Sequence, residues 1–532
     1  MAAAPEKLLN APTLGEFRRR YPLTVANLGA LPNREAWLRR IWELDARWHN
    51  AQQSQAPPAE VITPGPPPAG LEIEAEFDII YAGGVLGLLH AATLAHRYGR
   101  SVMVFDAHVV GQTHRDWNIS DEELRQFDAA GLFTSAELEA AIVNRYRSGF
   151  VKFHDANCAI KAPPLWMDNV LDVAVDADSL LQLAARKVRQ HKENALYDGL
   201  RFVRAYTQAE RVVVETEEAA TGRRRLFAAR LFVDAMGTNS PPARQLNGGR
   251  AITHVCPTVG TVARGFARGN APNEVDFTVG EILVSNEDAA DHRQLIWEGF
   301  AGSPQRGDYT TYLFFYDAVD SPADKSLLEL FERYFEKLPK YKRPGPQWRV
   351  QKPVFGYIPS VHQRGWRNEK RAAENRVLLV GDAAGLSSPL TFCGFGSHVR
   401  NLKRLTALTE QALKADALNA ASLADINAYE PRVAQMSSLA EFMRPLPRSK
   451  PQEINETMNA VMDALHALDE NVRRELFQDR MTFAALKQLL GRTAKTYPRI
   501  FQRLREHLGA RGTFWWLASI ARAWQDERRE RS

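Results

Sequence analysis

The sequence predicts an α/β fold: a Rossmann-type domain that is split in the sequence, an antiparallel β-sheet domain and a helical C-terminal region. Three observations predict it. A strand–helix–strand pattern begins at Phe77 around a glycine-rich turn, and such units favour parallel strands. Several β-type runs fill residues 255–357 with no long helix between most of them. From about His398 to the end, nearly all of the chain has helical periodicity.

Residues 1–53 are predicted to be N-terminal helices. Trp37, Ile41, Leu44 and Trp48 lie on one stripe of a helix, so we expect that helix to pack on the body of the protein. Residues 54–73 include six prolines. Because a proline-rich composition favours an extended, exposed chain, this segment is predicted to be a linker.

Residues 74–245 are predicted to form the larger part of the Rossmann-type domain. Phe77–Ala82 has the pattern of a buried strand, Val85–Tyr98 of an apolar helix and Ser101–Asp106 of a second strand. Asp176 is positioned to cap a helix that runs to about Asn194. Three further strands follow, the last two joined in a hairpin at Thr221-Gly222: Leu200–Tyr206, Arg211–Thr216 and Arg225–Val233.

Residues 246–357 are predicted to form a second domain, which would hold a substrate. Its β-type runs indicate a largely antiparallel sheet, interrupted by one helix near Lys325–Leu338. The runs are Val255–Phe266, Val275–Val284, Gln294–Phe300, Tyr309–Tyr316 and Trp348–Tyr357. Because Arg376–Val380 again has the pattern of a buried parallel strand, residues 358–410 are predicted to complete the Rossmann-type domain. Residues 411–532 are predicted to be the helical C-terminal region.

The glycine-rich turn has the sequence Ala82-Gly83-Gly84-Val85-Leu86-Gly87. It is the dinucleotide-binding fingerprint G-x-G-x-x-G with alanine in place of its first glycine. Gly84 would let the backbone approach a pyrophosphate, and Gly87 would let the helix pack closely. Asp106, at the end of the second strand, is positioned to accept ribose hydroxyls. The candidate cofactor-binding residues here are Gly83, Gly84, Leu86, Gly87 and Asp106; the alternative is a glycine-rich turn without a ligand.

Two further glycine motifs follow predicted strands. They are Val233-Asp234-Ala235-Met236-Gly237 and Val380-Gly381-Asp382-Ala383-Ala384-Gly385. A carboxylate in the second can accept hydrogen bonds from a ribityl chain. Behind it, Pro389-Leu390-Thr391-Phe392-Cys393-Gly394-Phe395-Gly396 leads into a helix, and the start of such a helix can lie against a flavin ring. These motifs add the candidates Gly237, Gly381, Asp382, Gly394, Phe395 and Gly396.

The order of these motifs resembles that of FAD proteins built like hydroxybenzoate hydroxylase and geranylgeranyl reductase. Three further stretches look like those of the Cru-type lycopene cyclases of bacteria and cyanobacteria and their paralogues. They are His114-Arg115-Asp116-Trp117-Asn118-Ile119-Ser120, Arg293-Gln294-Leu295-Ile296-Trp297-Glu298 and Thr310-Thr311-Tyr312-Leu313-Phe314. The resemblance runs from about residue 75 to about residue 490.

The resemblance implies an FAD-dependent lycopene β-cyclase. In such cyclases the linear end group of lycopene is protonated, the carbocation closes a six-membered ring, and a proton is lost. The FAD acts in its reduced form, NAD(P)H is the external reductant, and no net redox change occurs. An anionic reduced flavin beside a developing carbocation would be preorganised electrostatic stabilisation.

The resemblance also implies roles for other residues. Arg115 would contact the flavin or its phosphates; the alternative is an ion pair with Asp116 or Glu122. Trp117, Phe392 and Phe395 would line a tunnel for the polyene, or would be ordinary core residues.

The acid that protonates the substrate must be a carboxyl group kept neutral by apolar surroundings. Glu281, Glu298 and Asp317 lie among apolar and aromatic neighbours and are the candidate catalytic residues. The plant-type cyclases have a Phe-Leu-Glu-Glu-Thr motif in this region; this chain lacks it, and Asp317 lies at about the corresponding place. Glu281 and Asp317 rank equally and Glu298 slightly behind, and each is alternatively a surface carboxylate of its strand.

Charge is distributed unevenly along the chain. The formal net charge of the 532 residues is +5, but residues 487–532 contain eleven basic and four acidic side chains, a net +7. A basic end on a body of net charge −2 argues against a nucleic-acid-binding protein. Residues 499–524 combine arginines with Phe, Leu and Trp, a composition typical of an interfacial membrane helix. The alternative is a helix that packs on the body and exposes a basic face.

Other patterns concern the compartment and metals. The sequence has no run of 18 apolar residues and no secretory signal pattern. Cys158, Cys256 and Cys393 are far apart, and no His-x-x-x-His pair occurs, so we predict neither disulfides nor a metal site. The sequence thus predicts a cytoplasmic protein that associates peripherally with a membrane surface.

Two other functions are compatible with the motifs. One is an FAD- and NADPH-dependent isoprenoid reductase or a monooxygenase. The other is a paralogue that binds a carotenoid or a flavin without cyclising a substrate.

Overall fold

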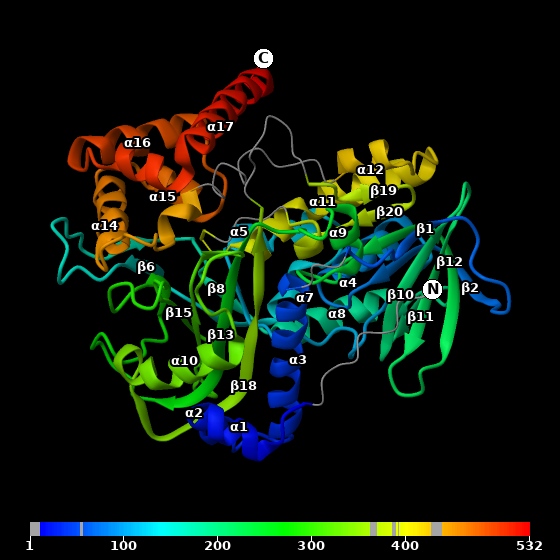
Figure 1. The fold of residues 1–532 in the computed structure, drawn as a ribbon, viewed down its shortest axis with the longest axis horizontal. Helices are drawn as coiled ribbons and strands as arrows, with labels where there is room; N and C mark the ends of the chain where they lie inside the picture. The colour runs from blue at the N-terminus through cyan, green and yellow to red at the C-terminus, as the bar shows by residue number, and fades with distance from the viewer. Residues whose placement is uncertain are drawn as a thin grey trace.

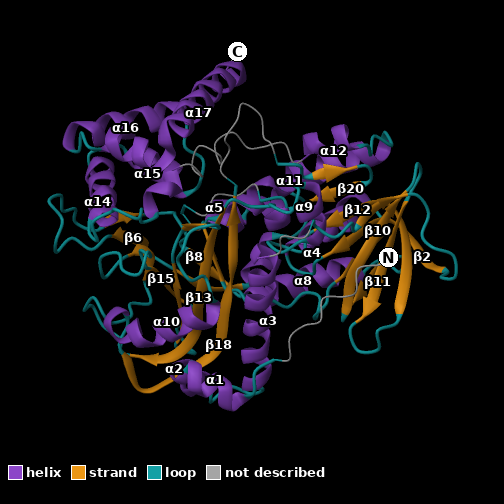
Figure 2. Ribbon diagram, in the orientation of Figure 1, coloured by secondary structure: helices purple, strands orange, loops and turns teal. Residues whose placement is uncertain are grey.

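The computed structural model describes residues 11–531 except 54–56, 362–369, 386–389, 392 and 427–438. Two large sheets lie side by side, and a helical region caps one of them (Figure 1). Helices and strands alternate around the first sheet, whereas the second is mostly strand (Figure 2). The predicted α/β fold class, with its antiparallel second sheet and helical C-terminal region, is confirmed.

The first sheet is the predicted Rossmann-type sheet. Its strand order is β1-β10-β11-β12-β2-β3-β9, with β20 beside the end of β12 and β19 beside β20. The pairs β12–β2, β2–β3, β3–β9 and β12–β20 are parallel, and β10–β11–β12 are antiparallel. The strands are β1 (Ile62–Pro64), β2 (Ile73–Ala82), β3 (Val102–Phe105), β9 (Ala195–Tyr197), β10 (Leu200–Thr207), β11 (Val212–Glu218), β12 (Arg224–Asp234), β19 (Ala373–Glu374) and β20 (Val377–Leu379).

Helices α4 (Leu86–Tyr98) and α8 (Ala177–Arg189) pack against this sheet and against each other, and α11 (Gly394–Lys414) packs on α4. Helix α4 is apolar, as the sequence predicts, and ends at Gly99, whose φ of 67° gives the left-handed cap that favours glycine. The proline-rich segment is not wholly outside the sheet, because β1 pairs in parallel with β10.

The second sheet has the order β17-β13-β16-β15-β14-β6-β7, with β18 on the other edge of β13. Its pairs are antiparallel except for β6–β14. The strands are β6 (Ser148–Lys152), β7 (Leu165–Met167), β13 (His254–Phe266), β14 (Val279–Val284), β15 (Ile296–Ala301), β16 (Asp308–Phe314), β17 (Asp317–Ala318) and β18 (Pro344–Ser360). Strands β6 and β7 thus come from the segment that the pattern grouped with the first sheet, because short strands do not encode their partners locally.

A small third sheet joins β4 (Trp117–Ile119), β8 (Val173–Val175) and β5 (Ile142–Arg145). Helix α10 (Leu327–Tyr341) covers the second sheet. The C-terminal region contains α12 (Ala420–Ile426), α14 (Glu453–His466), α15 (Glu470–Phe477), α16 (Phe483–Thr496) and α17 (Ile500–Arg531). Helix α17 breaks at Gly509, where φ is 67°, and its second half points away from the body (Figure 1). Among the described residues, no helix is both long and apolar enough to span a membrane.

The N-terminal helices are α1 (Leu14–Arg20), α2 (Pro22–Leu28) and α3 (Arg34–Gln53). Helix α3 stands between the two sheets (Figure 1) and contacts α10 and β18. Its Asp45 carboxylate accepts hydrogen bonds from the amides of Leu327 (2.7 Å) and Leu328 (3.1 Å) and from the Tyr357 hydroxyl (2.7 Å). Because these amides belong to the first turn of α10, Asp45 caps that helix from another element.

We expect Asp45→Ala to lower the free energy of unfolding by about 2 kcal/mol, because it leaves buried helix-end amides without an acceptor. Urea denaturation of the full chain measures this. Glu35→Ala, on the exposed face of the same helix, is the matched control and should change it by less than about 0.5 kcal/mol. Equal stability of the two variants would contradict the cap.

Candidate functional site

A cavity of 660 Å³ lies between the two large sheets. The first sheet contributes the carboxyl ends of its parallel strands, where ligands bind in open α/β sheets. The second sheet contributes residues of β13, β15, β16 and β18, and helix α3 closes a side. The volume is within the range of about 300–1,000 Å³ that small-molecule and cofactor sites occupy.

The glycine-rich turn forms one wall of this cavity. Gly83 has a φ of 115°, and a Cβ there would lie 2.3 Å from the carbonyl oxygen of Ala235, so only glycine fits. The Gly84 amide donates to Asp106 Oδ2 at 2.8 Å, and the His108 amide donates to Oδ1 at 2.9 Å. These bonds hold the Asp106 carboxylate at the end of β3, on the cavity wall.

Leu86 also lines the cavity, but Gly87 does not. A Cβ at Gly87 would lie 2.7 Å from the Cβ of Ala235. Gly87 therefore lets α4 approach the loop after β12, which is the packing role that the fingerprint predicts for its last glycine.

The other glycine motifs meet at the same cavity. Gly237, Gly381, Asp382, Gly394 and Phe395 all line it. Gly237 and Gly381 have φ values of 79° and 58°, which favour glycine. A Cβ at Gly237 or Gly394 would meet nothing within 4 Å, so both backbones are open to a ligand.

Gly396 is the exception among these candidates. It lies one turn into α11 and is buried, and a Cβ there would lie 2.5 Å from the Glu123 carboxylate. Gly396 therefore serves the packing of α11 against α5 (Asp121–Leu124). Residues 386–389 and Phe392 lie outside the described residues, so the predicted tunnel role of Phe392 stays a prediction.

Arg115 and Asp382 both line the cavity, and the charge of Arg115 acts on the Asp382 carboxylate. Burial raises the pKa of Asp382, and the charges of Arg115 and Lys370 oppose that rise. Burial lowers the pKa of Lys370 to about 7. Arg115 does not form an ion pair with Asp116 or Glu122 within the described part of the chain; Glu122 instead pairs with Arg480 at 3.2 Å.

Of the three candidate acids, only Glu298 lines the cavity. It is 4% exposed, and its carboxylate accepts one hydrogen bond, from Asn118 Nδ2 at 3.1 Å. Burial raises the pKa of Glu298 to about 8, and the Asn118 bond opposes the rise only in part. Glu298 is therefore a neutral acid at pH 7, in contact with a cavity.

Glu281 and Asp317 lie elsewhere. Glu281 pairs with Lys342 Nζ at 2.5 Å, and Asp317 with Lys325 Nζ at 3.1 Å. Glu281 is the cross-strand partner of Gly299, so it points to the face opposite that of Glu298, the neighbour of Gly299. Glu281 and Asp317, which the sequence ranked slightly above Glu298, thus lie away from this cavity. For Glu281 the strand register decides the face, and the local pattern does not contain the register.

Asp116 is a second carboxyl group on the cavity wall. Thr310 Oγ1 donates to it at 2.7 Å, and burial raises its pKa to about 6. From the sequence, Asp116 is predicted only as an alternative ion-pair partner of Arg115. The signal that could have identified it is its place between Arg115 and Trp117, in the stretch that resembles a cyclase.

Aromatic rings line the cavity beside these carboxyl groups. Trp117 stacks on Phe395 with centroids 4.1 Å apart, and His114 stacks on Phe355 at 4.5 Å. Tyr312 fixes the loop that bears Asp116, since its hydroxyl donates to the Asp116 carbonyl at 2.9 Å. The cavity therefore joins a polar end at Asp106 to an apolar end with two buried carboxyl groups.

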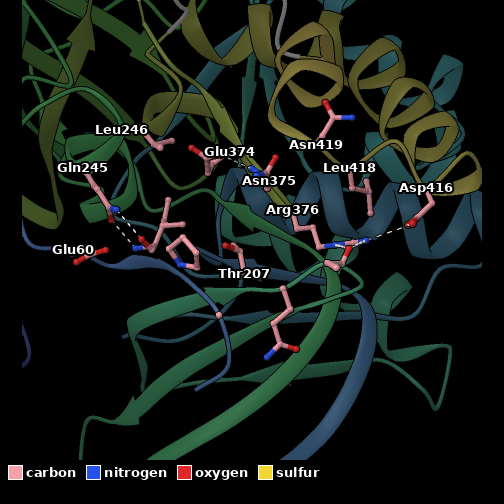
Figure 3. Close-up of a pocket in the computed structure, with 15 residues that line it drawn as sticks. Glu60, Thr207, Gln245, Leu246, Glu374, Asn375, Arg376, Asp416, Leu418 and Asn419 are labelled. Atoms are coloured by element: carbon pink, nitrogen blue, oxygen red, sulfur yellow. Dashed lines mark hydrogen bonds and ion pairs between the residues drawn. The ribbon is translucent and has the colours of Figure 1, made fainter. Parts of the chain in front are cut away.

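A second hollow of 830 Å³ lies at β1, the end of β10 and the segment before α12 (Figure 3). Its one deeply buried cation, Arg376, is already bonded to the carbonyl oxygens of Ala209 (2.9 Å) and Arg230 (3.1 Å). Two of its three acidic residues are paired as well, Glu374 with Arg371 at 2.6 Å and Asp416 with Arg230 at 3.1 Å. It does not share the glycine motifs, so the cavity between the sheets is the candidate site.

No known family profile matches the sequence, and no curated protein matches it. Among solved structures, the fold is similar to that of a geranylgeranyl bacteriochlorophyll reductase-like protein from Thermoplasma acidophilum (TM-score 0.57, 13% identity, 81% of this chain and 99% of that chain). It is also similar to the p-nitrophenol 4-monooxygenase of Pseudomonas putida (0.51, 14%, 78% and 99%). A third neighbour is the halogenase PltM in complex with FAD (0.53, 15%, 85% and 96%). At these identities the likeness shows the fold alone.

The raised pKa of Glu298 predicts a pH dependence of stability. Between pH 4.5 and about 8 the folded protein holds a proton on Glu298 that the unfolded chain has lost, so this group lowers stability as the pH rises, by about 1.4 kcal/mol per pH unit. Glu298→Gln should remove that slope. Urea unfolding of both proteins from pH 5 to pH 9 should show curves that diverge up to about pH 8. Parallel curves would contradict a neutral Glu298.

Proposed function

We propose that this protein is an FAD-dependent enzyme that acts on a linear carotene, lycopene, and cyclises its end group. The observation that carries the proposal is a neutral carboxyl group, Glu298, on the wall of a cavity that also contains the dinucleotide fingerprint. The fold, which is similar to that of flavin-binding PltM, supports the choice of FAD.

The residues fit FAD in three respects. Asp106 is oriented by two backbone amides at the place where an adenosine ribose binds. The positive-φ glycines Gly83, Gly237 and Gly381 keep the backbone close to the cavity. Gly394 opens the start of α11 to the cavity, where amides favour negative charge on a ligand. When bound and reduced at the expense of NAD(P)H, FAD would supply negative charge beside a carbocation.

The proton transfers can be assigned to two groups of this chain. Glu298 would donate its proton to a terminal C=C bond, and the resulting cation would be attacked by the next double bond to close the ring. A ring proton would then leave to Asp116, whose pKa of about 6 makes it ionised at pH 7. A pair of carboxyl groups with separated pKa values is the usual arrangement for an acid and a base in one site. No electrons are transferred, so the step balances without an oxidant.

The structural likeness to a geranylgeranyl reductase-like protein favours a second candidate, an isoprenoid reductase. Such an enzyme would use the same proton donor but would consume NADPH with each product. A monooxygenase would consume oxygen, and a non-cyclising paralogue would bind FAD and leave the pigment unchanged.

An apolar substrate of this kind resides in a membrane, and α17 offers a surface for one. Phe514, Leu517 and Trp524 follow a helical spacing and are 56%, 53% and 40% exposed, while Trp516 on the other side is buried. Arg511 is exposed, and the Arg528 guanidinium lies 4.6 Å from the Trp524 ring centre. An exposed apolar stripe with flanking arginines fits an anionic lipid surface. We propose that α17 docks there.

Expression in bacteria that accumulate lycopene tests the reaction. We expect γ- or β-carotene by chromatography, and at least a 100-fold loss of cyclised product for Glu298→Gln with bound flavin unchanged. Glu281→Gln, in a buried ion pair outside the cavity, is the control and should keep cyclising per mole of folded protein. Saturated products that form with stoichiometric consumption of NADPH would contradict the cyclase and support the reductase.

Flotation with liposomes tests the membrane surface. The chain should bind vesicles that contain phosphatidylserine, and Leu517→Ser with Trp524→Ser should reduce binding at least 10-fold, because each side chain contributes about 2 kcal/mol on burial. Leu71→Ser removes a similarly exposed leucine that is distant from α17 in the sequence, and it should leave vesicle binding unchanged. No flotation of the unaltered chain would contradict the proposal.

A further inference from the structure

We infer that the N-terminal helix α3 is part of the cofactor site and that its Arg40 and Arg47 bind the diphosphate of the dinucleotide. The inference rests on the proposed FAD cofactor and extends the site beyond the glycine motifs. Those motifs lie after residue 81, whereas α3 ends at Gln53, before the first sheet begins.

One face of α3 forms a wall of the cavity. Arg40, Leu44, Arg47 and Ala51 line it. They are spaced four, three and four residues apart, which places them in a row on one side of a helix. The two arginines of that row, Arg40 and Arg47, therefore line the same cavity from one side of the helix.

The other side of α3 is fixed to the body. Ile41 is fully buried, and Trp48 stacks on Tyr357 with ring centroids 4.5 Å apart. Asp45 holds the start of α10, as described above. Because these contacts set both the position and the rotation of the helix, the arginine row cannot turn away from the cavity without loss of the core contacts.

The cavity contains an excess of unpaired positive charge. Five arginines line it, and within the described part of the chain none of them forms an ion pair with a carboxylate: Arg40, Arg47, Arg115, Arg201 and Arg244. Arg40, Arg115 and Arg244 are half-buried, and Arg47 and Arg201 are exposed. The charge of Arg47 disfavours that of Arg40, and the charge of Arg201 disfavours that of Arg47, while Asp106 and Glu43 act in the opposite direction. Because the arginines of this wall outnumber these carboxylates, their arrangement favours an anionic ligand.

The hydrogen bonds of the two α3 arginines leave most of their donors available. Arg40 Nη2 lies 3.2 Å from His114 Nδ1, and Arg47 Nε donates to the Glu43 carbonyl at 3.2 Å. A guanidinium has five N–H donors, and its fork matches phosphate oxygens. The Arg244 side chain also contacts α3, through the Ala51 carbonyl at 3.3 Å, and its Nε is buried without a partner.

The location favours a diphosphate over another anion. The charge of Asp106 acts on both Arg40 and Arg47, and Asp106 is the residue expected to hold the adenosine ribose. In a dinucleotide the diphosphate is attached to that ribose and lies at the start of α4. Arg40 and Arg47 would therefore contact it from the side opposite Gly84.

Binding to the flavin-free full-length protein tests the inference. FAD, ADP and riboflavin are titrated separately, FAD and riboflavin by flavin fluorescence and ADP by competition. Arg40→Gln and Arg47→Gln should each raise the Kd for FAD and ADP about 10-fold or more, and should leave that for riboflavin, which has no phosphate, within 2-fold. Arg39→Gln, an exposed arginine of the same helix outside the cavity, is the matched control and should change none of the three.

The outcomes separate the two proposals. Unchanged FAD and ADP affinities in both variants would overturn the inference, as would an equal loss for riboflavin. A raised KM for NADPH with an unchanged FAD Kd would overturn it in favour of a second nucleotide on α3. Failure of the unaltered protein to bind FAD would instead refute the proposed cofactor. Equal thermal unfolding of the flavin-free variants shows that folding is not the cause.

Discussion

The carboxyl groups that are buried between the two sheets are the main physical constraint on this structure, because burial disfavours their charged form. Burial holds Glu298 neutral and raises the pKa of Asp116 and Asp382, and five arginines line the same cavity. Neither group of charges is stable there in isolation. The two sheets and the glycine turns keep water from Glu298, Asp116 and Asp382, whereas the arginines near α3 are half-buried or exposed.

Much of this arrangement follows from local sequence. The glycine motifs are short-range signals, since each requires a turn of particular geometry after a strand, and they converge because parallel strands end at one edge of a sheet. Gly87 and Gly396 show the limit of such signals. Both belong to the motifs, yet their missing Cβ atoms make room for Ala235 and Glu123 and not for a ligand.

The three candidate acids could not be separated by their place in the sequence. Glu281 and Glu298 have similar apolar neighbours. They differ in the face of the sheet on which they lie, because Glu281 is paired with Gly299 and not with Glu298 itself. A shift of one residue exchanges the two faces of a strand. The partners that neutralise Glu281 and Asp317, Lys342 and Lys325, lie beyond the reach of a local pattern. For the same reason, the cavity-lining face of α3 could not be predicted. The apolar stripe of this helix predicted that it packs on the body of the protein, but not that its neighbouring face lines a cavity.

The attachment of α3 has a consequence for the order of assembly. Its anchor points lie 281 to 312 residues later in the chain, at Ser326, Leu327, Leu328 and Tyr357. During synthesis the helix leaves the ribosome long before these partners exist, and contacts of such sequence separation form late in folding. The cavity between the sheets is thus open on one side while the first sheet assembles, and it closes only when the second sheet is complete. The wall that α3 contributes to the cavity and the second sheet are in this way completed together.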